Sequence, residues 1–195
     1  MSAREVPGAL RRELRYSRAA IETNLNALGL SMAEVKPLTE ALFDEKGLLG
    51  LYGSELLLLE RLLGIGSGSP AVELVGELIS VKRAPAGTGV SYGYLTKLDS
   101  DTNLGLVALG FSDGLPRAAT NQFSVSIAGV SFKGIGRIAM DQCVIDLGSS
   151  SPDVGAEVTF FNDNFSLNDF SKASGFSELE ILGRMHSRVA RVWAE

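Results

Sequence analysis

The chain has 195 residues, 45% of them hydrophobic and 21% charged, so it can bury the core of one ordinary domain, with or without a short second element. Its formal net charge is -5 and no stretch concentrates Lys and Arg, which argues against a nucleic-acid-binding surface. No apolar run reaches the ~20 residues of a membrane span, no secretory signal pattern is present, and the single Cys143 excludes an intrachain disulfide, so we expect an intracellular, cytoplasmic protein.

The first third of the chain predicts helices. Apolar side chains fall on one stripe at 3.6 residues per turn, namely Leu10, Leu14, Ile21, Leu25 and Leu28. A second helix is predicted from Leu38 to Asp44. A third is predicted from Ser54 to Leu63, with Ser54 as its N-cap and Gly64 at its end. Residues 1–69 are therefore expected to form a helical N-terminal segment, and the stretch 64–70 reads as a flexible connector to the second half.

From residue 70 the pattern changes to short strands interrupted by glycine. The predicted strands are Val72 to Arg83, Leu104 to Leu109, Phe123 to Ala128, Ile135 to Ala139, Cys143 to Leu147 and Glu157 to Phe161. Near the end, Ser177 to Glu180 has the pattern of a capping box that starts a short helix, and a last strand is predicted from Val189 to Trp193. Many short strands favour a closed barrel, because closure removes exposed edges. We expect an α+β chain, mainly β, with residues 70–195 as a small β-barrel-like domain.

Four segments of this second half carry a resemblance to one family. They are Val90-Ser91-Tyr92-Gly93, the segment from Ala108 to Arg117, the segment from Gly134 to Gln142 with its Met140-Asp141 pair, and the ending from Arg188 to Trp193. Their residues, order and spacing resemble the C-terminal β-domain of alanine racemases. The resemblance implies an isomerase reaction, the interconversion of L-alanine and D-alanine, that depends on pyridoxal phosphate. It also implies a dimer, in which this domain serves the cofactor of the partner subunit.

The resemblance assigns roles to three residues. Tyr92 matches the tyrosine that acts as acid/base on one face of the substrate α-carbon, opposite a lysine of the cofactor barrel. A phenol is a weak base near neutral pH, so such a tyrosine needs a partner that orients it and takes up its proton. Met140 and Asp141 fall where the family borders the substrate carboxylate. From the residues alone, Tyr92 could equally be an aromatic side chain packed at a strand end, Met140 a core methionine and Asp141 a turn residue.

The remaining chemistry-bearing residues suggest structural roles. Arg117 and Arg137 are expected to hold loops by pairing with Asp113 or Asp141. Cys143 stands in an apolar run and is expected to be a small buried residue. The single histidine and the single cysteine are far apart, so we expect no metal site.

The cofactor barrel of the family is matched only in fragments. Such an α/β barrel takes ~200 to 250 residues, whereas the β-domain pattern begins here near residue 70. Ala20 to Leu25 resembles the family's first helix, and Leu49 to Gly53 resembles the segment that closes the barrel. The family's cofactor motif, Val-Lys-Ala-x-Ala-Tyr-Gly, does not occur. The nearest string is Val35-Lys36-Pro37, which leaves a cofactor role for Lys36 open.

Four positions depart from the family pattern on the cofactor side. Lys46 stands in place of an arginine, Leu48 in place of a glycine near the phosphate, and Phe111 and Leu179 in place of tyrosines. Two hypotheses follow. The chain is a racemase half that needs a barrel from another chain, or it is a non-catalytic pseudoenzyme, a structural or partner-binding module that forms a monomer or a homodimer. The four departures on the cofactor side favour the second hypothesis, the non-catalytic module. They also predict that the chain alone does not bind pyridoxal phosphate.

Overall fold

The computed structural model describes residues 10–44, 48, 51–66, 68, 70–162 and 167–194. Six antiparallel strands close into a small barrel, because the first strand of the series also pairs with the last. In spatial order these strands are β2 (Val72–Ala84), β5 (Thr102–Val107), β8 (Cys143–Gly148), β7 (Val130–Ile135), β6 (Ser124–Ile127) and β9 (Glu157–Phe161). The expected β-barrel-like fold is confirmed.

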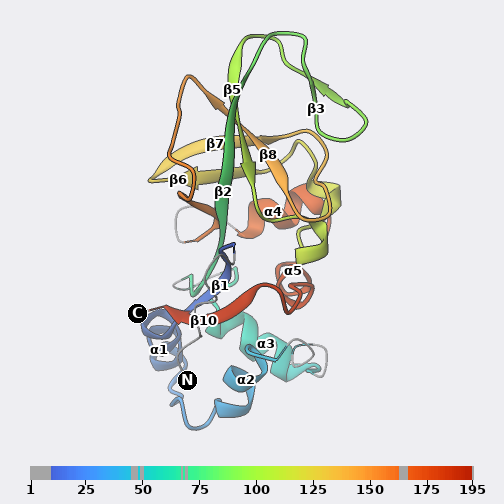
Figure 1. Ribbon diagram of the computed structural model, residues 1–195. Helices are drawn as coiled ribbons and strands as arrows, with labels where there is room; N and C mark the ends of the chain where they lie inside the picture. Colours follow the sequence, from blue (N-terminus) through green and yellow to red (C-terminus); the bar gives the residue numbers. More distant parts are fainter. Residues whose placement is uncertain are drawn as a thin grey trace.

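The long strand β2 connects the barrel to the rest of the molecule. Residues 74–76 of β2 pair both with β9 and with β1 (Arg12–Ser17), so these two neighbours lie on opposite edges. Beyond a register shift between Leu78 and Ser80, the second half of β2 pairs with β5. On the outer edge of β1 lies β10 (Ala190–Ala194), which runs parallel to it. Figure 1 shows the barrel at one end of the molecule and the first three helices at the other.

The strand β1 corrects the prediction that Leu10 and Leu14 belong to a helical stripe. The described helix α1 (Arg18–Leu28) begins only after Ser17, whose hydroxyl accepts a hydrogen bond from the Ala20 N–H. Leu14 and Tyr16 are fully buried and alternate with polar residues, which is the two-residue period of a strand. Pairing with β2 and β10 therefore prevails over helical periodicity in this segment.

The remaining helices differ from prediction in their bounds. They are α2 (Lys36–Ala41), α3 (Ser54–Leu62), α4 (Leu167–Ser174), which was not predicted, and α5 (Glu178–Gly183). The N-cap of α3 is Gly53, not Ser54. The capping box at Ser177 is half present, since its hydroxyl accepts from the Glu180 N–H while the Glu180 carboxylate binds Arg184.

One predicted strand, Ile135 to Ala139, is wrong. The strand β7 lies earlier and ends at Ile135, because Gly136 has a φ of 74° and turns the chain out of the sheet. A small hairpin, β3 (Gly89–Val90) and β4 (Thr96–Lys97), stands beside the barrel.

A single hydrophobic cluster extends from the helices through β1 into the barrel. Inside the barrel, Phe123 stacks on Phe160 and Phe170 packs against both rings. Cys143 is buried, as expected. Among the described helices, none is long and apolar enough to cross a membrane.

Candidate functional site

The loop between β3 and β4 carries Tyr92. Backbone φ angles of 59° at Ser91 and 81° at Gly93 turn the chain sharply on either side of it. The Ser91 hydroxyl donates to the carbonyl of Arg137 at 2.5 Å, and a Cβ on Gly136 would lie 2.8 Å from the Ser91 Cβ. These contacts fix the loop backbone, while the Tyr92 side chain is 77% exposed. Tyr92 therefore does not pack against the core at a strand end.

A second loop carries Met140 and Asp141 and is held by the turn that begins at Gly110. The carbonyls of Ala139 and Met140 accept hydrogen bonds from the N–H groups of Phe111 and Ser112, at 2.9 and 2.8 Å. A Cβ on Gly110 would lie 2.3 Å from the Met140 carbonyl oxygen, so only glycine permits this approach. The Met140 side chain is 58% exposed, which excludes the core alternative for this residue.

A buried carboxylate, Asp113, links this site to both ends of the chain. Its Oδ2 accepts from the Gly110 N–H at 2.8 Å. Its Oδ1 lies 3.1 Å from Arg188 Nη2 and 3.5 Å from Arg12 Nε, as ion pairs and not as aligned hydrogen bonds. Arg188 also binds Asp141 at 2.7 Å, and this hydrogen bond raises the pKa of the Arg188 guanidinium. The Met140–Asp141 loop is thus tied electrostatically to the buried Asp113.

The expected pairings of Arg117 and Arg137 with these aspartates are wrong. Arg117 lies instead over the ring of Phe111, with its guanidinium carbon 5.4 Å from the ring centroid. The Arg137 guanidinium faces the backbone of the tyrosine loop, since a Cβ on Gly93 would lie 3.4 Å from its Nη1. The pairs that do form involve Arg12 and Arg188. Sequence reasoning missed them because both arginines lie far along the chain from their partners.

The tyrosine loop, the Met140–Asp141 loop and the turn at Gly110 each expose apolar side chains. The two loops meet through Gly136 and Arg137, and the second loop rests on the turn at Gly110. The exposed apolar residues of the two loops and of the turn at Gly110 are Tyr92, Tyr94, Leu95, Met140 and Phe111, which we call the tyrosine face. Exposed apolar clusters of this kind mark interaction sites more often than isolated apolar residues do. In the sequence, the signal for Tyr94 and Leu95 was that these two apolar residues stand next to each other, shortly after Tyr92.

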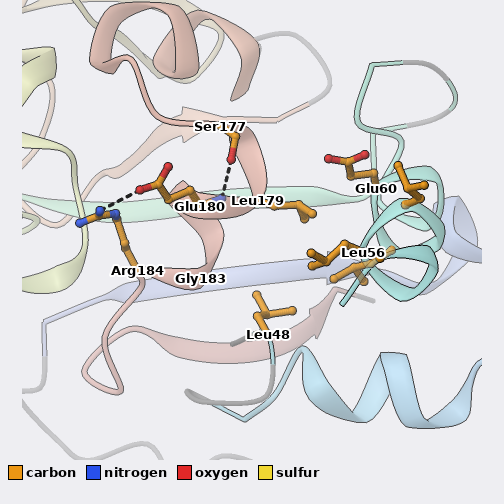
Figure 2. Close-up of a pocket in the computed structure, with 11 residues that line it drawn as sticks. Leu48, Leu56, Glu60, Ser177, Leu179, Glu180, Gly183 and Arg184 are labelled. Atoms are coloured by element: carbon orange, nitrogen blue, oxygen red, sulfur yellow. Dashed lines mark hydrogen bonds and ion pairs between the residues drawn. The ribbon is translucent and has the colours of Figure 1, made fainter. Parts of the chain in front are cut away.

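A separate groove of about 740 Å³ lies between α3 and α5 (Figure 2). Leucines dominate its described lining, which also contains two glutamates and one arginine: Leu48, Leu56, Leu57, Leu59, Leu179, Glu60, Glu180 and Arg184. Leu48 and Leu179 stand at two of the four positions that depart from the family pattern on the cofactor side. The structure brings these two positions together on one groove.

The described residues of this groove do not fit pyridoxal phosphate. A phosphate would meet mostly leucine side chains and two carboxylates. The Ser177 hydroxyl already accepts a hydrogen bond from the Glu180 N–H, and Arg184, the cation among the described lining residues, already binds Glu180 at 2.8 Å. Lys36 does not line the groove. Its side chain is 71% exposed on α2, 3.7 Å from Glu40. Lys46 lies outside the described residues.

Comparison with known proteins shows which family the β-rich part of the chain belongs to. The family model "Alanine racemase, C-terminal domain" matches residues 71–193. The alanine racemase of Streptomyces coelicolor is 41% identical over 128 residues, which are 64% of this chain and 33% of that protein. The alanine racemase of Thermobifida fusca is 39% identical over 128 residues, 64% of this chain and 34% of that protein.

Solved structures agree with these sequence relatives. The structure of alanine racemase from Streptomyces coelicolor matches with a TM-score of 0.66 and 37% identity, over 69% of this chain and 39% of that one. Biosynthetic alanine racemase from Pseudomonas aeruginosa matches with a TM-score of 0.62 and 28% identity, over 80% of this chain and 41% of that one. The chain thus spans about a third to two fifths of the length of the relatives it matches.

Proposed function

Because the chain belongs to the family of the alanine racemase C-terminal domain over residues 71–193, we propose that it is a β-domain module that presents Tyr92 to a partner chain. We further propose that the described residues do not themselves hold pyridoxal phosphate. A cytoplasmic location is part of the same proposal, and so is a division of the chain near residue 70 into an N-terminal segment and a β-domain that share one hydrophobic core.

The observation that carries the proposal is the exposure of the Tyr92 side chain on a rigidly held loop. A docked partner would cover Tyr92 together with the other apolar residues of the tyrosine face, and burial of that apolar area would stabilise the complex. The loop contacts to Gly136 and Arg137 would hold the tyrosine in position without help from the partner. This arrangement suits the cross-subunit role that the family resemblance implies for its tyrosine.

In a complex whose partner carries the cofactor, this chain would contribute proton transfer and substrate binding. The Tyr92 hydroxyl would exchange a proton with the α-carbon of L-alanine or D-alanine. The backbone N–H of Met140 would border the substrate carboxylate, and Arg188 would hold Asp141 in place beside it. Removing a proton on one face and returning it on the other requires a second group, which the partner would supply.

A second candidate is a non-catalytic binding module, and one observation favours it. Phe111 replaces the family tyrosine and lies beneath the Arg117 guanidinium, so this part of the face offers a packed aromatic surface and no hydroxyl. A second copy of the chain is one partner that such a module would bind. Both candidates use the tyrosine face, and they differ in whether the Tyr92 hydroxyl is needed.

Two measurements test the proposal. The first mixes the purified protein with pyridoxal phosphate and follows the absorbance of a lysine imine. We expect no stoichiometric imine, because the described groove offers the phosphate no free cation. An imine that forms in a 1:1 ratio and is lost in Lys36→Ala would contradict that part of the proposal.

The second measurement is complementation. An alanine racemase whose own motif tyrosine is replaced by phenylalanine is mixed with this chain, and D-alanine formation and complex size are followed. Restored racemisation that disappears in Tyr92→Phe, but persists in the control Tyr52→Phe at another exposed tyrosine, supports the half-enzyme. A complex without activity supports the binding module. If neither this mixture nor the chain alone forms a complex, the tyrosine face is not a docking surface.

A further inference from the structure

The groove between α3 and α5 has a composition that suits a ligand of a different kind from a phosphate. We propose that it binds a small apolar amine, with the hydrocarbon against the leucines and the ammonium group beside Glu60. This proposal is independent of the role of Tyr92, because the residues that line the groove lie outside the tyrosine face.

The walls of the groove come from two helices that present leucines to each other. Leu56, Leu57 and Leu59 come from α3 and Leu179 comes from α5. Figure 2 labels Leu56 and Leu179. Leu57 is 63% exposed, whereas Leu59 is fully buried and forms part of the core. A hydrocarbon in the groove would therefore rest on a fixed floor and remove an exposed leucine from water. The volume of about 740 Å³ falls within the range of small-molecule sites.

The charges at the groove favour a cation. Glu60 is half-buried and its carboxylate points from α3 toward α5 (Figure 2). Within the described part of the chain it forms no ion pair, whereas Glu180 is neutralised by Arg184. Arg184 is further held over the Phe176 ring, with 4.2 Å between its guanidinium carbon and the ring centroid. An ammonium group would neutralise Glu60, and an anion would be repelled by it.

The size of the electrostatic contribution follows from the exposure of Glu60. Because a half-buried carboxylate is still partly screened by water, its ion pair with an ammonium group contributes about a fivefold change in affinity. Apolar contact with the leucines supplies the rest of the affinity and is shared by any ligand with the same hydrocarbon chain. The two contributions can therefore be separated with ligands that differ only in their head group.

The test uses octylammonium, octanol and octanoate with protein labelled at the leucine methyl groups. We expect octylammonium to shift the NMR signals of Leu56, Leu57 and Leu179, and to bind more tightly than octanol, with octanoate weakest. Glu60→Gln should weaken octylammonium about fivefold and leave octanol unchanged. The matched control is Glu40→Gln, which removes an exposed glutamate of α2 that does not line the groove.

A second variant tests the apolar contribution without disturbing the core. Leu57→Asn changes a mostly exposed leucine and should weaken all three ligands by a similar factor. If no leucine methyl signal moves with any ligand, the groove is not a binding site. If octanoate or pyridoxal phosphate binds as tightly as octylammonium, or if Glu60→Gln has no effect, the assignment to a cation is wrong.

Discussion

The carboxylate of Asp113 joins three segments that are distant in the sequence. It receives the Gly110 N–H and lies beside guanidinium groups of Arg12 from β1 and Arg188 from the segment before β10. Its side chain is 0% exposed, so its negative charge is stabilised by these arginines and not by water. Asp113 therefore fixes the Gly110 turn, which supports the Met140–Asp141 loop, relative to both ends of the chain.

We predict that Asp113→Asn lowers the free energy of unfolding by about 2 to 3 kcal/mol at neutral pH. The carboxamide still accepts from the Gly110 N–H, but the two arginines lose their anion. Both arginines are partly exposed, so the loss is smaller than the ~3 to 5 kcal/mol of a fully buried pair. Denaturant unfolding measures the change.

The matched variant is Glu40→Gln, which breaks an exposed pair with Lys36. It should change stability by less than about 0.5 kcal/mol. Equal effects of the two variants would mean that Asp113 contributes no more to stability than a surface charge does.

At the scale of elements, the barrel closes tightly because β7 has a glycine where a side chain would meet the aromatic stack. A Cβ on Gly134 would lie 2.1 Å from Phe123 Cζ, and the Phe123 ring is held by Phe160 and Phe170. The Gly134 N–H also donates to the Phe123 carbonyl at 2.9 Å. Neither the ring nor the backbone can move away without disturbing the other strands.

Gly134→Ala should therefore lower the free energy of unfolding by about 2 kcal/mol through overpacking. Gly183→Ala is the control, because a Cβ at this position of α5 meets no heavy atom within 4 Å. The control should change stability by less than about 0.5 kcal/mol in thermal or denaturant unfolding. A tolerated Gly134→Ala would show that the Phe123 ring is mobile.

A second link between elements is the ion-pair network of Arg15. From β1, Arg15 binds Glu157 of β9 at 2.8 and 2.9 Å and Glu73 of β2 at 3.2 Å. The hydrogen bond from Arg15 holds the pKa of Glu157 below its ordinary value. A depressed carboxylate pKa contributes stability above the unfolded pKa of about 4.3, and this stability is lost as pH falls through the folded pKa.

Arg15→Met should consequently destabilise the protein at pH 7 and less at pH 3, because protonation of Glu157 becomes more favourable as the pH falls toward its lowered folded pKa, and the protonated carboxyl no longer forms the ion pair with Arg15. Unfolding curves at a series of pH values measure the difference. Lys36→Met, which breaks the exposed pair with Glu40, should leave the pH dependence almost unchanged. If Arg15→Met destabilised the protein equally at both pH values, the effect would come from packing of the aliphatic part of the Arg15 side chain and not from its charge.

The elements also show what the sequence could and could not predict. The strand Glu157–Phe161 was predicted with its observed bounds, because it stands between clear turn signals. The segment of β1 fits both a helical stripe and a two-residue alternation, and only its pairing with β2 and β10 decides between them. The helix α4 spans only eight residues and has one buried residue, Phe170, so its amphipathic pattern covers a short stretch of the sequence.

The candidate site also contains parts that the sequence could predict and parts that it could not. Tyr92, Met140 and Asp141 come from local motifs, and their roles stay predictions. The ion pairs of Asp113 join residues brought together only by the closed fold, so they left no local signal. The sequence singled out Leu48 and Leu179 as departures from the family pattern, but the groove that they share, with its shape and charge, arises only from the packing of α3 against α5.

At the scale of the whole molecule, the hydrophobic core is continuous from the helical end to the barrel. Leu14 and Tyr16 of β1 belong to the same cluster as Phe160 inside the barrel. At the helical end, the single Trp193 of β10 packs against Phe43, with ring centroids 4.9 Å apart. Trp193 fluorescence therefore reports on a region remote from β6, while circular dichroism reports on all elements. A continuous core predicts one cooperative unit.

We predict that Val125→Ala, a cavity in the fully buried part of β6, shifts the Trp193 fluorescence transition and the circular dichroism transition together. Two lost methyl groups and the cavity correspond to about 2 kcal/mol. The control is Val154→Ala at an exposed position, which should shift neither transition. If circular dichroism alone responds to Val125→Ala, the helical end and the barrel unfold separately. The β1–β10 pair would then be an attachment to the barrel and not part of its core.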